Sequence, residues 1–523
     1  MAAKPGFHSE SGADLQAALL RTGNGGGGEE EERMGIDEML RLHAGEFGRW
    51  QLRHFLLTST AWALEALHTM VMIFADREPT WRCSDRPCPA DPCLLGPGEW
   101  EWAGGPATST VVEWGLVCGD KYKIGLVQSL FFAGCMIGAG VFGHLSDSFL
   151  GRKGSLTIVC ILNTVFGLLT SMSPTYWIYA GLRFLTGFST GGVGLCAFVL
   201  ATEPVGPTKR GAAGMSTFYF FSSGIALLSG IAYLFQSWRS LYIVTSLPSF
   251  LFIIAVVPFI SESPRWYLVR RRINEAMDVM RAIANSNGRH LPDGLTLKLD
   301  DDYDDNDDCD ELLVGKAVSG TIIDVLRSPT TRIRLFLTVA INFLCSVVYY
   351  GLSLNVVNLK TNLYLSVLLN AVAEMPAFLL TAVLLDYLGR KPLGVGTMWL
   401  SGVFCIVGSL VGGVGAMKIV RMVCGTVGIF GMAATYNLLF IYTAELFPTV
   451  VRNAALGCAT QAGQMGAILA PLVVVFGDGI PFAVFGVCGL VAGMLAFFLP
   501  ETMNRPFYDT MAGLEQGESK VVE

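Results

Sequence analysis

A series of long apolar runs constrains this chain more than any other feature. One of them, Ile124 to Phe142, is interrupted by little beyond Gln128 and a serine. About twelve such runs, each of roughly 20 residues and thus long enough to cross a bilayer as a helix, begin near residues 55, 124, 156, 176, 213, 240, 333, 364, 394, 417, 455 and 480. The sequence therefore predicts an all-α membrane protein with twelve transmembrane helices.

Composition and the order of polar segments support this prediction. The chain is 52% hydrophobic and 15% charged, which is too apolar for a soluble protein of this size. Six apolar runs precede a long polar insert and six follow it. We expect a disordered cytosolic N-terminus at 1–50, a six-helix half at 51–260, a cytosolic loop with an acidic segment at 261–332, a second six-helix half at 333–500 and a cytosolic tail at 501–523.

Cationic residues near the ends of the runs indicate which side faces the cytosol. If twelve helices alternate, the basic clusters at 152–153, 209–210, 270–272 and 390–391 all fall on one side. That side is predicted to be cytosolic, with both termini inside. The sequence carries no clear sorting signal, so we expect the plasma membrane, with the vacuolar membrane as the alternative.

The segment 76–123 lies on the opposite side in this topology and carries four cysteines, Cys83, Cys88, Cys93 and Cys118. Cysteines on an oxidising face of a membrane predict two disulfides, for which three pairings are possible. A zinc site is the weaker alternative because no histidine joins the four thiols. No metal and no cofactor are expected.

A second pattern is an internal repeat. The stretch "GHLSDSFLGRKGS" at 143–155 returns as "LLDYLGRKP" at 384–392. Four pairs of landmarks share an offset of about 240 residues: Gly151 with Gly389, Glu203 with Glu445, Arg210 with Arg452, and Glu262 with Glu501. Two six-helix halves repeated in parallel place a substrate site between them near the middle of the membrane, reached alternately from each side.

The repeat also assigns a role to charges at the cytosolic helix ends. Acids and bases in both halves are expected to pair between helices and hold the cytosolic mouth shut. Breaking such pairs once per cycle is feasible if each is worth only about a few kcal/mol. The set comprises Asp147, Arg152, Glu203 and Arg210 in the first half and Asp386, Arg390, Glu445 and Arg452 in the second. The alternative is that these residues merely terminate helices.

Several of these motifs resemble the major facilitator superfamily: the text at 143–153, "RFLTGFSTGG" at 183–192, "ESPRWYL" at 262–268 and "DYLGRKP" at 386–392. The long cysteine-bearing loop, "AEMPAF" at 373–378 and "YTAELFPTVVRN" at 442–453 resemble the organic cation/carnitine transporter family, in its plant form. This resemblance, which covers about residues 50–505, implies a major facilitator fold and alternating access. Sugar carriers share "ESPRW" but otherwise resemble the chain less.

Two acids inside predicted membrane helices are candidate functional residues, because a carboxylate there costs about 3 kcal/mol and usually faces a cavity or a partner. Glu374 would attract a cation, and its match to the family's eighth-helix pattern implies a place near the substrate. Glu65, with His68 one turn away, is a candidate for proton coupling. The alternatives are a hydrogen-bonded structural acid at 374, a second cation anchor at 65 and a packing role for His68.

Aromatic and amide residues complete the predicted substrate site. Ring faces attract organic cations by roughly 0.5 to 2 kcal/mol each, and Tyr349 matches a seventh-helix position of the family. Gln464 stands where family members carry an acid or a base, which leaves zwitterions and neutral polar solutes open. The expected substrate-binding set is Glu374, Tyr349, Gln464, Gln461, Tyr219, Tyr436 and Asn355.

The chain is therefore expected to be a secondary transporter and not an enzyme, since no nucleotide-binding motif or catalytic cluster is evident in its soluble segments. Its expected substrate is a small organic cation or zwitterion of the carnitine, betaine or polyamine kind, with protons as a possible coupling ion. The alternative is a proton-coupled carrier of sugars or other neutral polar metabolites. The lipid bilayer is the other expected partner, nucleic acid is not, and a monomer suffices for alternating access. A receptor that binds nutrients without transporting them is a further alternative.

Overall fold

The computed structural model describes residues 32–83, 92–95, 99–292, 294–298, 322–412, 415–477, 479–503 and 514. Within this part of the chain, twelve helices are long and apolar enough to cross a membrane, as the sequence predicts. The protein is thus an integral membrane protein. The first six spans are α3 (Arg49–Met70) continued by α4 (Met72–Ala75), α6 (Tyr122–Asp147), α7 (Gly151–Ser171), α8 (Tyr176–Thr202), α9 (Pro207–Leu234) and α10 (Trp238–Ala255).

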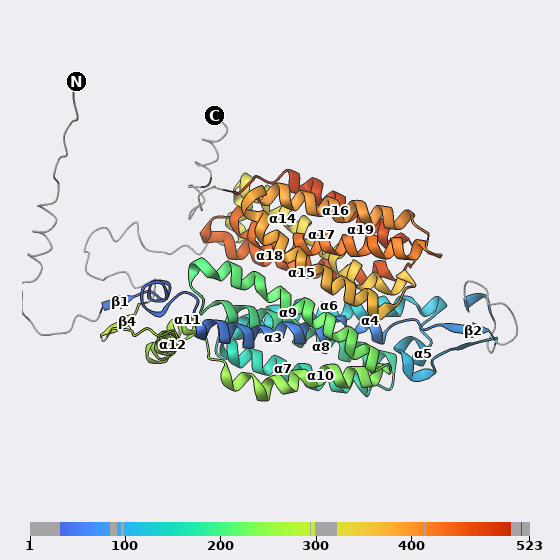
Figure 1. Cartoon of the computed structure of the whole chain (residues 1–523), viewed down its shortest axis with the longest axis horizontal. Helices are drawn as coiled ribbons and strands as arrows, with labels where there is room; N and C mark the ends of the chain where they lie inside the picture. Colours follow the sequence, from blue (N-terminus) through green and yellow to red (C-terminus); the bar gives the residue numbers. More distant parts are fainter. Residues whose placement is uncertain are drawn as a thin grey trace, which may run out of the picture.

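The other six spans follow the polar insert. They are α14 (Pro329–Leu354), α15 (Leu363–Leu388), α16 (Arg390–Leu410), α17 (Met417–Leu446), α18 (Thr449–Val474) and α19 (Ile480–Phe497). Figure 1 shows them as one layer, with the first six helices as a second layer beside it. We call these layers the N half and the C half. They meet mainly where α6 packs on α18 and α9 packs on α15.

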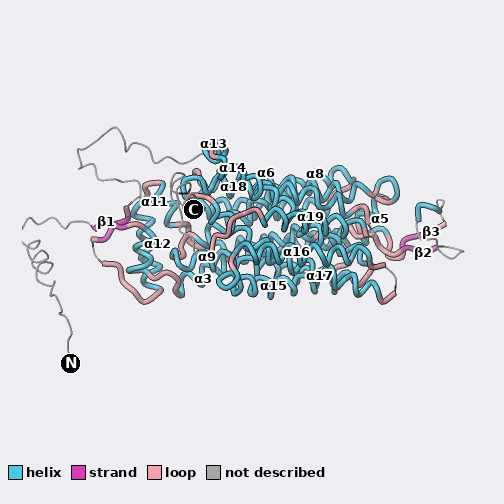
Figure 2. The backbone as a smooth tube through the Cα atoms, turned by 90° about the horizontal axis from the view of Figure 1, so that it is seen from above, coloured by secondary structure: helices cyan, strands magenta, loops and turns pink. Residues whose placement is uncertain are grey.

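The two ends of the bundle carry different additions (Figure 2). At one end the antiparallel strands β2 (Trp81–Cys83) and β3 (Trp100–Trp102) pair, with the helix α5 (Thr110–Trp114) and short turns η2 (Pro92–Leu94), η3 (Pro106–Thr108) and η4 (Cys118–Asp120) nearby. We call this the disulfide end. The opposite end, where α7 and α16 begin with Arg152 and Arg390 near their starts, is called the arginine end.

At the arginine end, residues 32–50 differ from the expected disordered arm. Strand β1 (Glu32–Met34) pairs in parallel with β4 (Leu295–Leu297), and the helices α2 (Ile36–Met39), η1 (Leu40–Ala44), α11 (Pro264–Val269) and α12 (Ile273–Ser286) complete a small unit. Met39 and Leu40 are fully buried in its core with Met280 and Ile283. The physical reason is that these apolar side chains find a partner surface about 240 residues further along the chain, which removes them from water. The remaining short helices are η5 (Val257–Phe259), η6 (Asn355–Leu359) and α13 (Ile322–Arg327).

Contacts between the halves concentrate toward the disulfide end. The Ser129 hydroxyl of α6 donates to the Ile468 carbonyl of α18 at 2.7 Å. A side chain added at Gly125 would meet Val475 at 2.6 Å and the Pro471 carbonyl at 3.0 Å, so the two backbones approach closely there. Toward the arginine end, Phe198 of α8 packs edge-on against Phe440 of α17, with ring centroids 5.7 Å apart.

Candidate functional site

Glu374 lies near the middle of α15 and is only 1% exposed. Its Oε2 accepts a hydrogen bond from the Ser222 hydroxyl of α9 at 2.5 Å, and its Oε1 accepts one from the Tyr349 hydroxyl of α14 at 3.2 Å. Ser222 belongs to the N half and Tyr349 to the C half, so the carboxylate joins the two. Pro376 follows two residues later inside the helix and, lacking an N–H, leaves one helical hydrogen bond unmade beside the acid.

Aromatic rings lie next to this carboxylate. Tyr349 stacks on Tyr436 of α17, with ring centroids 5.2 Å apart and planes 24° apart. Tyr350 packs edge-on against Tyr349 and against Phe132 of α6, the latter at 4.9 Å. Such rings present negative faces that attract a cation, so acid and rings together form a site suited to positive charge.

Tyr219 lies on the N-half side of the same junction. Its ring packs edge-on against Phe378 of α15 at 5.5 Å, and Phe378 follows Glu374 by one helical turn. Tyr219 and Tyr436 are each partly exposed, whereas Tyr349 is buried. The predicted tyrosines are therefore brought together around one acid.

Gln464 and Gln461 lie on the face of α18 that points at the N half. Helical periodicity places them in line with Ile468 and Leu472, which contact Ser129 and Gly125 of α6 near the disulfide end. Gln464 is partly exposed and Gln461 is exposed. The two amides thus lie on the arginine side of the α6–α18 contact.

Asn355 occupies a different place. It begins η6 near the disulfide end, is 1% exposed, and accepts a hydrogen bond from the Asn358 amide at 2.7 Å. Asn358 in turn donates to the Val474 carbonyl of α18 at 2.9 Å. This cluster ties α14 to α18 rather than lying beside Glu374.

Glu65 and His68 point toward different helices. The carboxylate of Glu65 packs on α8, where an added side chain at Gly194 would collide with it, and its Oε2 has no hydrogen-bond partner among the described residues. His68 is fully buried and its Nε2 lies 3.2 Å from the Ser249 hydroxyl of α10. No contact between the two side chains is recorded within the described part of the chain.

The N-half charges at the arginine end form a cluster. Arg152 Nη2 lies 2.9 Å from Asp147 and 3.2 Å from Glu203. Arg210 instead pairs with Asp37 of the N-terminal unit at 2.6 Å, and Arg265 also donates to Asp37. Asp37 was missed from the sequence, where no local pattern points to it.

The C-half cluster repeats the core of this arrangement. Arg390 Nε and Nη2 donate to the two carboxylate oxygens of Glu445 at 2.9 and 3.0 Å. Arg452 lies at the same end near the start of α18, and the side chain of Asp386 lies outside the described residues. In both halves the described arginine–glutamate pair stays within one half.

Two further acids were visible in the repeat but not identified as site residues. Glu262 accepts hydrogen bonds from the backbone N–H groups of Arg152 and Lys153, and Glu501 does the same for Arg390 and Lys391. Each carboxylate therefore sits on the positive N-terminus of a helix. Burial raises the pKa of Glu262 despite these bonds; burial also acts on Glu501, but four backbone hydrogen bonds outweigh it and lower its pKa.

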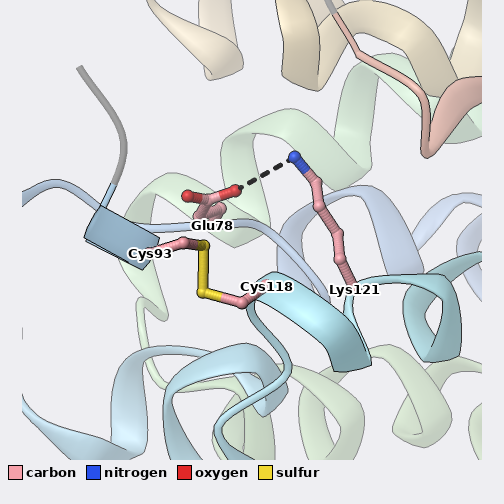
Figure 3. The surroundings of a disulfide bond; sticks show 4 residues. All are labelled: Glu78, Cys93, Cys118 and Lys121. Carbon is pink, nitrogen blue, oxygen red and sulfur yellow. Dashed lines mark ion pairs between the residues drawn. A yellow bond between two sulfur atoms is a disulfide. The ribbon is translucent and has the colours of Figure 1, made fainter. Parts of the chain in front are cut away.

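The disulfide end contains one fully described bridge, between Cys93 and Cys118 (Figure 3). Cys83 is also disulfide-bonded, and Cys88 lies outside the described residues. Near this bridge Lys121 pairs with Glu78 at 3.7 Å. Glu113 of α5 accepts a hydrogen bond from the Trp238 indole at 2.8 Å and pairs with Arg239, so the loop is attached to the N half.

Comparisons with known proteins identify the family. A family model described as "Sugar (and other) transporter" matches residues 71–512. The chain is 68% identical over 491 residues to organic cation/carnitine transporter 4 of Arabidopsis thaliana, covering 94% of this chain and 93% of the relative. It is 31% identical over 529 residues to the organic cation transporter protein of Drosophila melanogaster, covering 93% and 95%. The chain belongs to the organic cation/carnitine transporter family.

Solved structures agree on the fold. The inward-open xylose transporter XylE of E. coli superposes with a TM-score of 0.63 at 15% identity, covering 89% of this chain and 99% of the transporter. The major facilitator fold expected from the sequence is thereby confirmed, as is the family resemblance. Membership of a transporter family also agrees with the expectation of a chain that is not an enzyme.

Within this family member, sequence reasoning missed the partners of the predicted residues. Ser222, Phe132 and Phe378 contact Glu374 or its aromatic neighbours, yet nothing distinguishes them from other small or aromatic residues of membrane helices. The one available signal was the stretch "TFYFFSSG" at 217–224, where two serines follow a run of rings.

Proposed function

We propose that this chain is a secondary active transporter of small organic cations or zwitterions that works by alternating access. The observation that carries this proposal is the carboxylate of Glu374, held between the halves beside stacked tyrosines. The printed names of its relatives, organic cation/carnitine transporters and an organic cation transporter, support the same substrate class.

The chemistry of Glu374 favours a cation over a neutral solute. Both hydrogen-bond partners of the carboxylate are hydroxyl groups, which do not neutralise its charge. A positively charged substrate would do so, and attraction is strong in a site removed from water. The stacked rings of Tyr349 and Tyr436 would then cover a quaternary ammonium group, which has no N–H with which to donate a hydrogen bond.

Gln464 and Gln461 extend the proposal to zwitterions. An amide can donate to a carboxylate and accept from a hydroxyl or ammonium group. The two side chains lie on the face of α18 that points at the N half, on the arginine side of its contact with α6. A molecule with a quaternary ammonium at one end and a carboxylate at the other could use both regions. Neutral polar metabolites would use the amides alone, and sugars are the less supported alternative.

We further propose that Glu65 carries the coupling proton. Its Oε2 lacks a hydrogen-bond partner in the described structure, and the side chain packs on α8 of the N half at Gly194. His68, bonded to Ser249, would act as a packing partner of α10. The basic clusters at the arginine end support a cytosolic location for that end and for both termini, in the plasma membrane or alternatively the vacuolar membrane, with a monomer as the working unit.

The test is uptake of labelled tetraethylammonium, carnitine and glucose into proteoliposomes, with and without an imposed proton gradient. For Glu374→Gln we expect uptake of tetraethylammonium to fall about 30-fold or more, which corresponds to about 2 kcal/mol. Glu65→Gln should keep exchange of substrate but lose the stimulation by the gradient.

The matched control is Glu101→Gln, which removes one carboxylate from the exposed strand β3, where it pairs with Arg82. This variant should transport normally. Loss of uptake in both variants would point to general instability, and full uptake by Glu374→Gln would remove the carboxylate from the substrate site. Transport of glucose alone would favour the neutral-metabolite alternative.

A further inference from the structure

Tyr364 lies in the first turn of α15 at the disulfide end and belongs to the C half, but its ring packs on the N half. Its ring stacks on Phe74 of α4, with centroids 5.5 Å apart and planes 10° apart. Tyr233 of α9 packs edge-on against the same ring at 5.7 Å. The ring of Tyr364 is thus held between two segments of the other half.

Polar contacts join the same residue to the N half. Arg77, which follows α4, donates to the Tyr364 hydroxyl, and its guanidinium lies 5.7 Å from the centre of the ring. The Ser229 hydroxyl of α9 donates to the Tyr364 backbone carbonyl at 2.6 Å. One C-half residue therefore receives contacts from four N-half residues, through its ring, its hydroxyl and its backbone.

The local backbone fixes where Tyr364 stands. Asn362 caps α15 by accepting a hydrogen bond from the Leu365 N–H at 3.1 Å, and Lys360, two residues before it, adopts a left-handed conformation with φ 53°. A capped first turn does not fray easily. The ring is therefore presented by a rigid helix end and moves with α15.

The contact of α9 with α15 links Tyr364 to the candidate substrate site. Ser222 and Ser229 are two turns apart on one face of α9, and they bond Glu374 and Tyr364 respectively. The two contacts on α15 are about 15 Å apart along the helix. If α15 moves away from α9 at the disulfide end, both hydrogen bonds must break.

We propose that Tyr364 is the latch that holds the disulfide end closed, and that its release from Phe74, Arg77, Ser229 and Tyr233 opens the central site to that side. A substrate that takes the place of Ser222 on Glu374 removes the second tie between α9 and α15. Occupation of the site then leaves Tyr364 as the main remaining polar tie along this pair of helices. This role concerns the opening step and does not depend on which solute is carried.

The test uses a reporter cysteine, Ala226→Cys, between Ser222 and Ser229 on α9. In sealed membranes, a membrane-impermeant thiol reagent is applied on the side that labels Gly412→Cys, a position at the disulfide end with open space around it. Labelling of the parent chain is subtracted. Tyr364→Phe, which loses only the hydroxyl bond, should raise the labelling rate of the Ala226→Cys reporter about threefold to fivefold, and Tyr364→Ala on the order of tenfold.

A second reporter separates opening from unfolding. Gln461→Cys, on the arginine side of the α6–α18 contact, should label more slowly from its own side in the latch variants, because alternating access closes one end as the other opens. Unfolding would instead raise labelling at both positions. The matched control is Tyr387→Ala, which removes a tyrosine from the same helix where it is 78% exposed.

The outcome that overturns the proposal is an unchanged labelling rate of the Ala226→Cys reporter in Tyr364→Phe, Ser229→Ala and Arg77→Gln while Gly412→Cys labels normally. Tyr364→Phe and Ser229→Ala remove one hydrogen bond each, and Arg77→Gln removes the guanidinium with its hydrogen bond and ring contact. All three keep the chain folded more readily than Tyr364→Ala. A rise at both reporters would also count against a latch, since it would show general loosening. Neither result bears on substrate identity, because the labelling needs no substrate.

Discussion

At the arginine end, each half contains an arginine–glutamate pair, but the two pairs differ in the length of their hydrogen bonds. In the N half, Arg152 divides its donors between Glu203, at 3.2 and 3.3 Å, and Asp147, at 2.9 Å. In the C half, Arg390 directs two donors to the two carboxylate oxygens of Glu445, at 2.9 and 3.0 Å. The repeated sequence thus reproduces the pair, while its neighbours decide how closely the two side chains engage.

The surroundings of the two pairs differ more. The N half adds the N-terminal unit, in which Asp37 receives both Arg210 and Arg265. The C half adds a hydroxyl, since Thr502 donates to Glu445 at 2.6 Å. The duplicated motif therefore has different neighbours in the two halves. In the N half they come from the N-terminal unit, and in the C half from the segment that follows α19.

The largest expected difference between the halves concerns their arginines. Arg390→Ala leaves Glu445, whose side chain is 12% exposed, without its cation and should lower the free energy of unfolding by about 2 kcal/mol. Arg152→Ala should cost about half as much, because its bonds to Glu203 are longer, at 3.2 and 3.3 Å, and its other acidic partner, Asp147, is 72% exposed and readily solvated. Thermal unfolding in detergent measures both. The control is Arg272→Ala, which removes the arginine of an exposed ion pair with Glu275. Equal losses of stability in the two halves would contradict the comparison.

A smaller effect is expected from the N-terminal brace. Asp37→Asn removes the charge that Arg210 and Arg265 share and should destabilise the N half by about 0.5–1 kcal/mol, with no change in the protease resistance of the C half. Limited proteolysis that reports the two halves separately would measure this. Asp278→Asn, which removes an exposed acid from α12, should have no effect, and a response of the C half to Asp37→Asn would show that the brace is not confined to one half.

The smallest expected effect concerns the pH dependence of stability, which should have opposite signs for Glu501 and Glu262. The pKa of Glu501 is lowered from its ordinary 4.5, so its contribution to stability is present above pH 4.5 and is lost as the pH falls through its folded value. The pKa of Glu262 is raised, so its contribution is present below pH 4.5 and is lost as the pH rises through its folded value.

Unfolding midpoints of the wild type, Glu262→Gln and Glu501→Gln between pH 7 and pH 4 test these signs. The stability advantage of the wild type over Glu501→Gln should shrink on acidification, whereas its advantage over Glu262→Gln should grow. Solvent screening keeps both effects small. Parallel pH profiles for the two variants would show that the helix ends are electrostatically equivalent.

The parts of this structure that sequence predicts are those encoded by periodicity and repetition. Apolar runs give the helices because a bilayer sets their length, and the repeated Gly-Arg-Lys text gives the arginine ends. Glu374 is conspicuous as an acid in an apolar span. Such signals are local, or they recur at a constant offset along the chain.

Contacts between distant, unrepeated residues could not be predicted. Ser222 and Glu374 are 152 residues apart, and Asp37 and Arg265 are 228 apart; neither pair leaves a pattern in the chain. The different partners of Glu65 and His68 could not be predicted for the same reason. The two residues are three positions apart and therefore lie close together on the surface of α3. What each side chain contacts depends on the helices packed there, α8 and α10.

The N-terminal unit has a consequence for how the protein is made. Residues 32–44 leave the ribosome before the twelve described membrane helices, but Met39 and Leu40 are buried in a cluster with α11, α12 and β4, which follow the sixth span. Since chains are synthesised from the N-terminus, the apolar side chains of this segment stay exposed until the chain has been synthesised as far as residue 297. Its docking would then mark the completed N half, so that assembly of the first six helices can be followed through the burial of a segment that lies outside the membrane.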